Sequence, residues 1–388
     1  NDKLRYIMKN LILSAAMSAL LLVSACGPAY EKPTAGSDIG FALDFFKQVN
    51  ASSENGANVV VSPYSAGVAL SMLAEGAAGE TRAEFDDVLN GCLFKAEPSS
   101  DGKVIAESAN SLWIDGGFKV KDKYTELLAS DFDALVKTED FSDPSTVKAI
   151  NDWCSEHTSG KITEIIDRLN PEMVMVLVNA LYFNAPWEKS FDPAMTNEET
   201  FHGTKGESKV QMMSMQSEFY YAEYEGFSVI ALPYSGGRYA MYVVLPPAGM
   251  NVDSALPYVN EYTYDAAMDM MTSCEVRLKL PKFTLETSQV LNGILMSMGL
   301  KSAFTPAADF SGISSNGALV LDQVKQKCYI DVSEKGTEAA AVTSAQIKLT
   351  SAAITPRPVE MVVDRPFLFL IADSQTENIL FAGKILNL

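Results

Sequence analysis

The sequence has little of what most catalytic and metal sites require. Only two histidines occur among its 388 residues, His157 and His202, and they do not stand at the spacing of a shared metal ion. Glycine-rich phosphate loops, the serine nucleophile elbow and the His-Glu-x-x-His zinc motif are all missing. Carboxylates are plentiful, but none forms a recognisable catalytic pair. We therefore expect no enzyme, no cofactor and no metal site.

Positive charge is also scarce. The chain carries 30 Lys and Arg against 49 Asp and Glu, a formal net charge of −19, and no block of basic residues. Nucleic acids and other polyanions are bound largely through clusters of Lys and Arg. The composition therefore excludes a nucleic-acid partner and gives no evidence of a heparin site, and the acidity is explained by solubility.

Cysteines are few and widely separated. Apart from Cys26, they are Cys92, Cys154, Cys274 and Cys328, with no Cys-x-x-Cys pair among them. This spacing predicts buried free thiols. A disulfide in an oxidising compartment stays open as an alternative, because spacing in the sequence does not settle pairing.

Residues 1–25 are typical of an export signal. From Met8, one basic residue is followed by an apolar run that ends in Val-Ser-Ala before Cys26 and is too short for a membrane span. The ending resembles the bacterial lipobox, whose Cys is lipidated and begins the mature chain. We expect 1–7 to be an upstream artefact and 26–37 a lipidated flexible tether. The protein would then be anchored to the bacterial envelope, at the outer membrane or cell surface. A plain signal peptide, and hence secretion, is the alternative.

The rest of the chain predicts a mixed α+β protein. Helical periodicity and capping residues predict helices at 39–49, 63–75, 79–90, 145–159 and 288–298. Apolar runs and alternation predict strands at 173–183, 229–232, 239–245, 276–280, 366–371 and 379–381. Helices concentrate in the first half without regular alternation with strands. No Pro- or Gly-rich linker divides 38–388, which we expect to be one domain.

The segment 333–358 has an unusual composition. It is long and made mostly of small residues, but it is neither Gly/Ser-rich nor charged. Side chains alternate between two faces in a strand, and positions 337, 339, 341, 343 and 345 are all Thr or Ala. Such a face could slide beneath a covering layer, with Gly336 as a flexible point. Loops this long are usually functional or disordered. We therefore predict an exposed, functional, strand-forming loop.

Several motifs in a fixed order resemble the serpin family of loop-inserting protease inhibitors. They include NVVVSPYS at 58–65, NDWCSEHTSGKI at 151–162, LVNALYFNAPWEKSFDP at 177–193, EKGTEAAA at 334–341 and DRPFLF at 364–369. The resemblance implies the serpin fold: N-terminal helices packed on a large mixed central β-sheet, two further sheets, and an exposed reactive-centre loop at about 334–360. It also implies a suicide-substrate inhibitor whose cleaved loop enters the central sheet. Under this mechanism we expect Thr337 to be at least partly exposed before insertion.

The resemblance assigns roles to individual residues. The hinge of the loop would be Glu334, Gly336, Thr337, Ala339, Ala340 and Ala341. The shutter, where the sheet opens, would be Ser62, Ser65, Asn179 and Gln326. The breach at the top of the sheet would be Trp187 and Lys282, with Lys282 paired to Glu334. Without the family pattern, Ser62 would be interpreted as a helix cap, Trp187 as a core residue and Lys282 as a charged surface residue.

One shutter residue departs from the family pattern. Gln326 occupies a position that is usually His. An amide can donate and accept hydrogen bonds at once, as a neutral imidazole does, but it cannot titrate. We therefore expect a His-dependent pH sensitivity of the shutter to be missing.

The scissile bond follows from counting along the hinge. The family pattern places it at Thr350–Ser351, and because the loop is longer than in familiar members, Lys348, Leu349 and Ile354 stay open as alternatives. Thr350 suits an elastase-like or subtilisin-like protease, and Leu349 would also suit a papain-like one. A trypsin-like target would need cleavage after Lys348, outside this register. We expect a monomer. A non-inhibitory serpin, which the small-residue hinge argues against, and a surface-binding lipoprotein are the alternatives.

Overall fold

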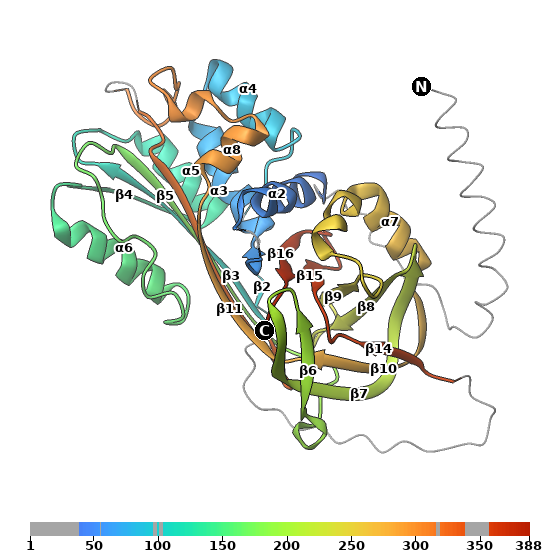
Figure 1. Ribbon diagram of the computed structural model, residues 1–388. Helices are drawn as coiled ribbons and strands as arrows, with labels where there is room; N and C mark the ends of the chain where they lie inside the picture. The colour runs from blue at the N-terminus through green and yellow to red at the C-terminus, as the bar shows by residue number, and fades with distance from the viewer. Residues whose placement is uncertain (1–38, 55, 96–98, 101–103, 316–318, 338–356) are drawn as a thin grey trace, which may run out of the picture.

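The computed structural model describes residues 39–388 except 55, 96–98, 101–103, 316–318 and 338–356 (Figure 1). Its α-helices are α2 (Ile39–Ser52), α3 (Pro63–Gly76), α4 (Gly79–Val88), α5 (Asp122–Phe132), α6 (Pro144–Glu156), α7 (Glu261–Met270) and α8 (Asn292–Met298). Its strands are β1 (Val59–Val61), β2 (Ser99–Ser100), β3 (Ile105–Asp115), β4 (Leu135–Glu139), β5 (Met175–Pro186), β6 (Asn197–Gly203), β7 (Gly206–Tyr224), β8 (Phe227–Pro233), β9 (Tyr239–Leu245), β10 (Thr272–Pro281), β11 (Phe283–Val290), β12 (Gln323–Ser333), β13 (Gly336–Thr337), β14 (Val359–Val362), β15 (Phe367–Asp373) and β16 (Ile379–Ile385). The predicted concentration of helices in the first half and strands in the second is confirmed.

Seven of the described strands form one mixed sheet. Its order is β11-β12-β13-β5-β3-β2, with β4 beside β3. The β12–β5 and β3–β4 pairs are parallel, and the other pairs are antiparallel. The large mixed sheet expected from the sequence is thus present. Figure 1 shows its long strands crossing the molecule as one twisted layer.

The other strands form one nine-stranded sheet rather than two separate sheets. Its order is β1-β16-β15-β9-β8-β7-β10-β14, with β6 beside β7. The 19-residue β7 joins its parts, because β7 pairs with β6 at its start, with β10 through its middle and with β8 at its end. The prediction of two further sheets is corrected in this respect.

Apolar layers on both faces of the seven-stranded sheet hold the molecule together. One layer lies between the two sheets, where Phe183 of β5 packs edge-to-face on Phe381 of β16 at 6.4 Å. On the other face, α6 buries Ile150 and Cys154 against Val178 of β5. A larger cluster joins α2 and α3 to the sheets. Burial of this kind contributes about 25 cal/mol per Å² of apolar surface.

Local signals explain most helix boundaries. Ser62 caps α3 by accepting a hydrogen bond from the Ser65 amide, and Gly299 ends α8 at a φ of 122°. The predicted helix at 288–298 begins only at Asn292, so its first turn is wrong. Residues 288–290 extend β11 instead, because they pair with residues 325–327 of β12. Tertiary pairing overrides helical periodicity here.

Cys154 and Cys328 are buried, unpaired thiols, as the sequence predicts, whereas Cys92 and Cys274 are only partly buried, so the prediction of burial is wrong for those two. Burial raises the pKa of Cys154 and of Cys328 to about 12, so both are unreactive near neutral pH. In the part of the chain that the structure describes, no helix is long and apolar enough to cross a bilayer. The predicted export signal, the tether and Cys26 lie outside the described residues.

Candidate functional site

The seam between β5 and β12 has two unlike halves. Residues 323–328 of β12 pair directly with 176–181 of β5, in parallel. Beyond Cys328 the strands separate, and residues 336–337 lie between them, pairing with 332–333 of β12 and 185–186 of β5. We call these the closed half and the open half of the seam. A central sheet that is paired at one end and parted at the other can admit a further strand.

A buried network of polar side chains spans the closed half. The Gln326 amide oxygen accepts from the Ser62 amide at 3.0 Å, and its NH₂ group donates to the Ser62 carbonyl at 2.9 Å and to Asn179 Oδ1 at 2.8 Å. Asn179 Nδ2 donates to the Ser65 carbonyl at 2.8 Å and to Asn110 Oδ1 at 2.6 Å. All five residues are at most 1% exposed. The structure thus brings together the four predicted shutter residues and adds Asn110 of β3, which no sequence signal marked.

The chemistry of this network explains how Gln can stand in the place of His. Gln326 accepts through Oε1 and donates through Nε2, and a neutral imidazole likewise has one acceptor and one donor nitrogen. None of the five side chains ionises near neutral pH. A satisfied buried network fixes one arrangement, and each bond contributes about 1 kcal/mol while a broken one leaves costly unpaired groups. The hydrogen bonds of this network therefore do not depend on pH.

Trp187 organises the open half. Its indole Nε1 donates to the Ser333 carbonyl at 2.9 Å, and its backbone amide donates to the Lys335 carbonyl at 2.9 Å. Its ring stacks on Tyr234 with centroids 4.5 Å apart and planes 12° from parallel. Trp187 thereby fixes the turn that leads from β12 into the hinge, which is the breach position that the resemblance implies.

The expected ion pair between Lys282 and Glu334 is formed. Lys282 Nζ lies 2.8 Å from Glu334 Oε2, and Thr196 Oγ1 donates to Glu334 Oε1 at 2.9 Å. Burial by itself raises the pKa of Glu334. The carboxylate also accepts hydrogen bonds from Lys282, Thr196 and a backbone amide, and it lies beside the lysine charge. Together these interactions outweigh burial and hold the pKa of Glu334 below its usual value. Glu334 is thus ionised and fixed at the start of the hinge. Thr196, in the turn before β6, was not identified from the sequence.

The prediction that Thr337 is partly exposed is wrong. Thr337 is 1% exposed, and its Oγ1 lies 2.6 Å from the Tyr234 hydroxyl. A polar side chain can be buried here because Tyr234 provides a hydrogen-bond partner. Gly336 makes the approach possible: its φ is 149°, and a Cβ there would clash with the Ala185 carbonyl. Two hinge residues, Gly336 and Thr337, are therefore already part of the sheet.

The remaining predicted positions are not described by the structure. They are the hinge residues Ala339, Ala340 and Ala341, and the candidate cleavage positions Lys348, Leu349, Thr350, Ser351 and Ile354. Among the described residues, no group of three or more His, Cys, Asp or Glu side chains could hold a metal ion.

Comparisons with known proteins agree with this arrangement. Residues 37–388 match the family model described as Serpin (serine protease inhibitor). The chain is 33% identical over 372 residues to an uncharacterised serpin-like protein of Thermococcus kodakarensis, covering 92% of this chain and 86% of that one. It is 34% identical to Iris of Ixodes ricinus, covering 89% and 97%.

A solved structure extends the agreement to three dimensions. The thermophilic serpin tengpin in its native state has a TM-score of 0.83 to this fold at 29% identity, covering 94% of this chain and 97% of that one. The family model spans nearly all of the described residues, including both halves of the seam. The chain therefore belongs to the serpin family, whose members are typically protease inhibitors rather than catalysts.

Proposed function

We propose that this serpin traps a target protease as a suicide substrate, by inserting its cleaved loop into the β5–β12 seam. The observation that carries the proposal is the position of Gly336 and Thr337, which pair with both strands at once. The hinge thus occupies the first two positions of a new central strand. The closed half ahead of it consists of the same two strands, still paired to each other.

The register of the open half supports insertion of the small-residue face. Thr337 lies opposite Val332 and Ala185. Continuing the antiparallel register by two residues would bring Ala339 opposite Ile330 and Phe183, which are buried in the layer between the sheets. Odd-numbered positions from 339 to 345, all Ala or Thr, would therefore enter this apolar layer. Even-numbered positions would face the side that α6 covers.

Insertion is favoured by hydrogen bonding. It would replace one ladder of six residue pairs with two longer ladders. The net gain is on the order of 10 hydrogen bonds, at ~1 kcal/mol each. The native state would therefore be kinetically trapped, because the closed half must part before the gain is realised.

The chemistry belongs to the protease. Its nucleophile would attack the carbonyl of Thr350, the peptide bond to Ser351 would break, and the amine of Ser351 would leave with the C-terminal fragment. The loop then stays esterified to the enzyme. Insertion would carry the bound enzyme along the seam before water releases it, since ~3.3 Å per residue over the inserted strand amounts to tens of ångströms. Strand insertion competes with hydrolysis of the ester.

The target class and the location are part of the proposal. Cleavage after Thr350 favours an elastase-like or subtilisin-like protease, with cleavage at Leu349, Lys348 or Ile354 as alternatives. The lipobox-like ending at Cys26 favours export and a lipid anchor on the bacterial envelope. Mass spectrometry of the mature N-terminus tests the anchor, and an unmodified Cys26 would overturn it.

Incubation with an elastase tests the proposed inhibition. We expect an SDS-stable adduct and, on the same denaturing gel, a C-terminal fragment whose N-terminal residue is Ser351. Parallel incubations with subtilisin, papain and trypsin rank the target classes. Cleavage of the loop without any adduct would indicate a non-inhibitory serpin. No cleavage by any of the four would favour a surface-binding lipoprotein.

A further inference from the structure

A polar cavity lies at the far end of the closed half, away from the hinge. The loop between α6 and β5 lies there against the start of β12, and the cavity has a volume of about 640 Å³. Its lining comes from that loop, from the end of β11 and from the start of β12. Cavities of several hundred Å³ are of the size in which proteins bind small molecules.

The walls of this cavity are fixed by polar contacts. Lys325 Nζ of β12, whose side chain is only 11% exposed, lies 3.1 Å from Asp167 Oδ1 and ties the loop to the strand. Asp322 Oδ2 accepts from the amides of Val174 and Met175 at 2.6 and 3.1 Å, where β5 begins. The cavity is therefore preorganised, which lowers the entropy lost when a ligand binds.

The charge of the lining is positive, in a chain whose net charge is −19. Two cations, Arg168 and Lys325, and one carboxylate, Asp167, line the cavity. Asp167 is paired with Lys325, whereas Arg168 makes no hydrogen bond or ion pair with any residue that the structure describes. A guanidinium group can bind a carboxylate through two parallel hydrogen bonds. An anion would therefore meet an unused donor group, and a cation would meet net repulsion.

Another part of the lining is apolar. Leu169 and Met173 pack against the cluster beneath α6 and also line the cavity. Val290, at the end of β11, lines it as well and is 49% exposed. Removing apolar surface of this kind from water favours binding. The lining thus fits a molecule that has one anionic group and an apolar body.

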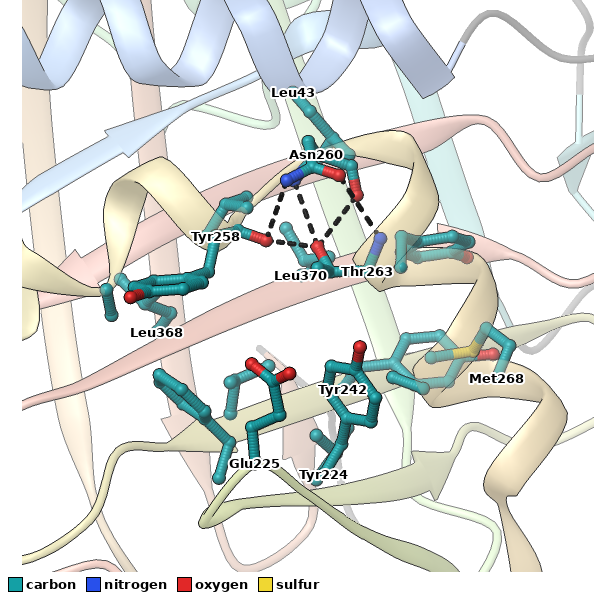
Figure 2. Close-up of a pocket in the computed structure, with 17 residues that line it drawn as sticks. Leu43, Tyr224, Glu225, Tyr242, Tyr258, Asn260, Thr263, Met268, Leu368 and Leu370 are labelled. Atoms are coloured by element: carbon teal, nitrogen blue, oxygen red, sulfur yellow. Dashed lines mark hydrogen bonds between the residues drawn. The ribbon is translucent and has the colours of Figure 1, made fainter. Parts of the chain in front are cut away.

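The cavity beneath α7 has the opposite electrostatic character. Aromatic and aliphatic side chains dominate its lining, among them Tyr242 and Met268 (Figure 2). Glu225 is the only charged residue among the described residues that line it, and Figure 2 shows its carboxylate pointing into the cavity. An anion is therefore disfavoured beneath α7, so the sign of a ligand's charge distinguishes the two cavities.

We propose that the polar cavity binds a small organic anion, a carboxylate on an apolar body, and that the bound anion holds the closed half together. The carboxylate would bind Arg168, and the body would lie against Met173 and Val290. Met173 leads into β5, whereas Lys325 belongs to the segment of β12 that pairs with β5. Parting of the two strands would separate the walls of the site, so the anion binds the closed form more tightly. Binding does not depend on the proposed inhibition, whereas any effect of the anion on inhibition rests on it.

Isothermal titration of the full chain with three matched probes tests the charge preference. The probes are indole-3-propionate, tryptophol and tryptamine, which share one ring system and are anionic, neutral and cationic. We expect indole-3-propionate to bind at least ~10-fold more tightly than tryptamine. Equal or tighter binding of tryptamine would overturn the proposal, and so would no binding of indole-3-propionate at millimolar concentration.

Two substitutions locate the site. Arg168→Gln removes an exposed cation and should weaken indole-3-propionate about fivefold, the upper end for an exposed ion pair, while tryptophol binds as before. Lys205→Gln removes the same charge from the exposed turn between β6 and β7, at the other end of the molecule, and is the control (Figure 1). It should leave the affinity for all three probes within about twofold of the parent. Equal effects of the two substitutions would overturn the location.

Hydrogen exchange of the native protein tests the effect on the closed half. With indole-3-propionate at ten times its Kd, the amides of residues 323–328 should exchange about tenfold more slowly, while those of β14 stay unchanged. Unchanged exchange at 323–328, or equal slowing at both places, would overturn the claim that the anion holds the closed half. Binding and local protection without an elastase adduct would leave this site in place and would overturn the proposed inhibition alone.

Discussion

The two halves of the seam use the same pair of strands and opposite chemistry. The closed half is held by uncharged amides and hydroxyls, centred on Gln326 and Asn179. The open half is held by a stacked Trp187–Tyr234 pair and by the Lys282–Glu334 ion pair, with the hinge between the strands. One half keeps the strands together, and the other keeps the start of the loop between them.

This difference separates two tasks that loop insertion requires. The open half fixes the register, because Thr337 can lie in only one place between Tyr234 and the strands. The closed half sets the barrier, because its network must break before the next residues enter. Substitutions in the loop should therefore change the stoichiometry of inhibition. Substitutions in the closed half should lower the stability of the fold, and those in the open half should lower it by less.

The largest expected effect is the loss of inhibition when a charged side chain is placed on the face of the loop that enters the layer between the sheets. Ala341→Arg would bring a guanidinium group into the layer between the sheets, at a cost of several kcal/mol. Each ~1.4 kcal/mol added to the insertion barrier slows insertion about tenfold relative to hydrolysis. We expect the stoichiometry of inhibition to rise at least ~10-fold. Glu338→Arg, on the other face and opposite the partly buried Asp331 and Asn184 in the extended register, is the control and should stay within about twofold of the parent. Equal behaviour would contradict the extended register.

The second largest effect is a loss of stability when the hydrogen-bond network of the closed half is broken. Asn179→Ala removes the residue that joins Gln326, Ser65 and Asn110, and leaves buried polar groups unpaired. We expect a loss of about 2–3 kcal/mol, seen as a lower guanidinium midpoint and faster unfolding. Asn184→Ala on the same strand, whose amide donates to the Tyr182 hydroxyl at 3.0 Å outside the network, is the control and should cost less than ~1 kcal/mol. Equal losses of stability in the two variants would show that the network does not stabilise the fold beyond a single ordinary hydrogen bond.

A third and smaller effect concerns the inserted hinge. Tyr234→Phe and Thr337→Val each remove one side of their hydrogen bond, and each should cost about 1 kcal/mol. The double variant should cost little more than either single change, because the bond is already lost in each. Guanidinium midpoints of the four proteins give the coupling energy. Additive losses would mean that the two hydroxyls do not interact, and that the hinge lies outside the sheet in solution.

The smallest effect is the pH response of the ion pair. The pKa of Glu334 is below its ordinary value of 4.5 in the folded chain. Its stabilising contribution is therefore present above pH 4.5 and is lost as pH falls further, since the unfolded state binds the proton first. Lys282→Met should reduce this loss by less than ~1 kcal/mol in unfolding experiments at pH 3 to 7. The buried hydrogen-bond network of the closed half should contribute no change between pH 5 and 8, because none of its five side chains ionises. A transition near pH 6 traced to this network would contradict its uncharged character.

Much of this site could be predicted because its residues lie in motifs that are local in sequence. Ser62 is both a helix cap and a shutter residue, and the hinge motif around Gly336 is short. The burial of Thr337 could not be predicted, since its hydrogen-bond partner Tyr234 is about a hundred residues away in the sequence. Asn110 was missed for the same reason, because an Asn in a strand is ordinary until its neighbours are known.

The errors in the fold have a similar origin. Residues 288–290 have helical periodicity, but their pairing with β12 makes them strand. The length of β7 depends on three different partners, so the joining of two expected sheets into one is a property of the assembled fold. The cavity beneath α7 likewise combines residues from segments around 43, 225, 260 and 370. Each element was plausible alone, and only packing brought them together.

A crystal structure of the chain after cleavage in its loop would test the insertion mechanism most directly. We predict a full strand between β5 and β12, with Ala339 opposite Phe183 and Ile330, and loss of the direct bond between Gln326 and Asn179. A cleaved chain in which that bond persists and the loop lies outside the sheet would contradict the mechanism.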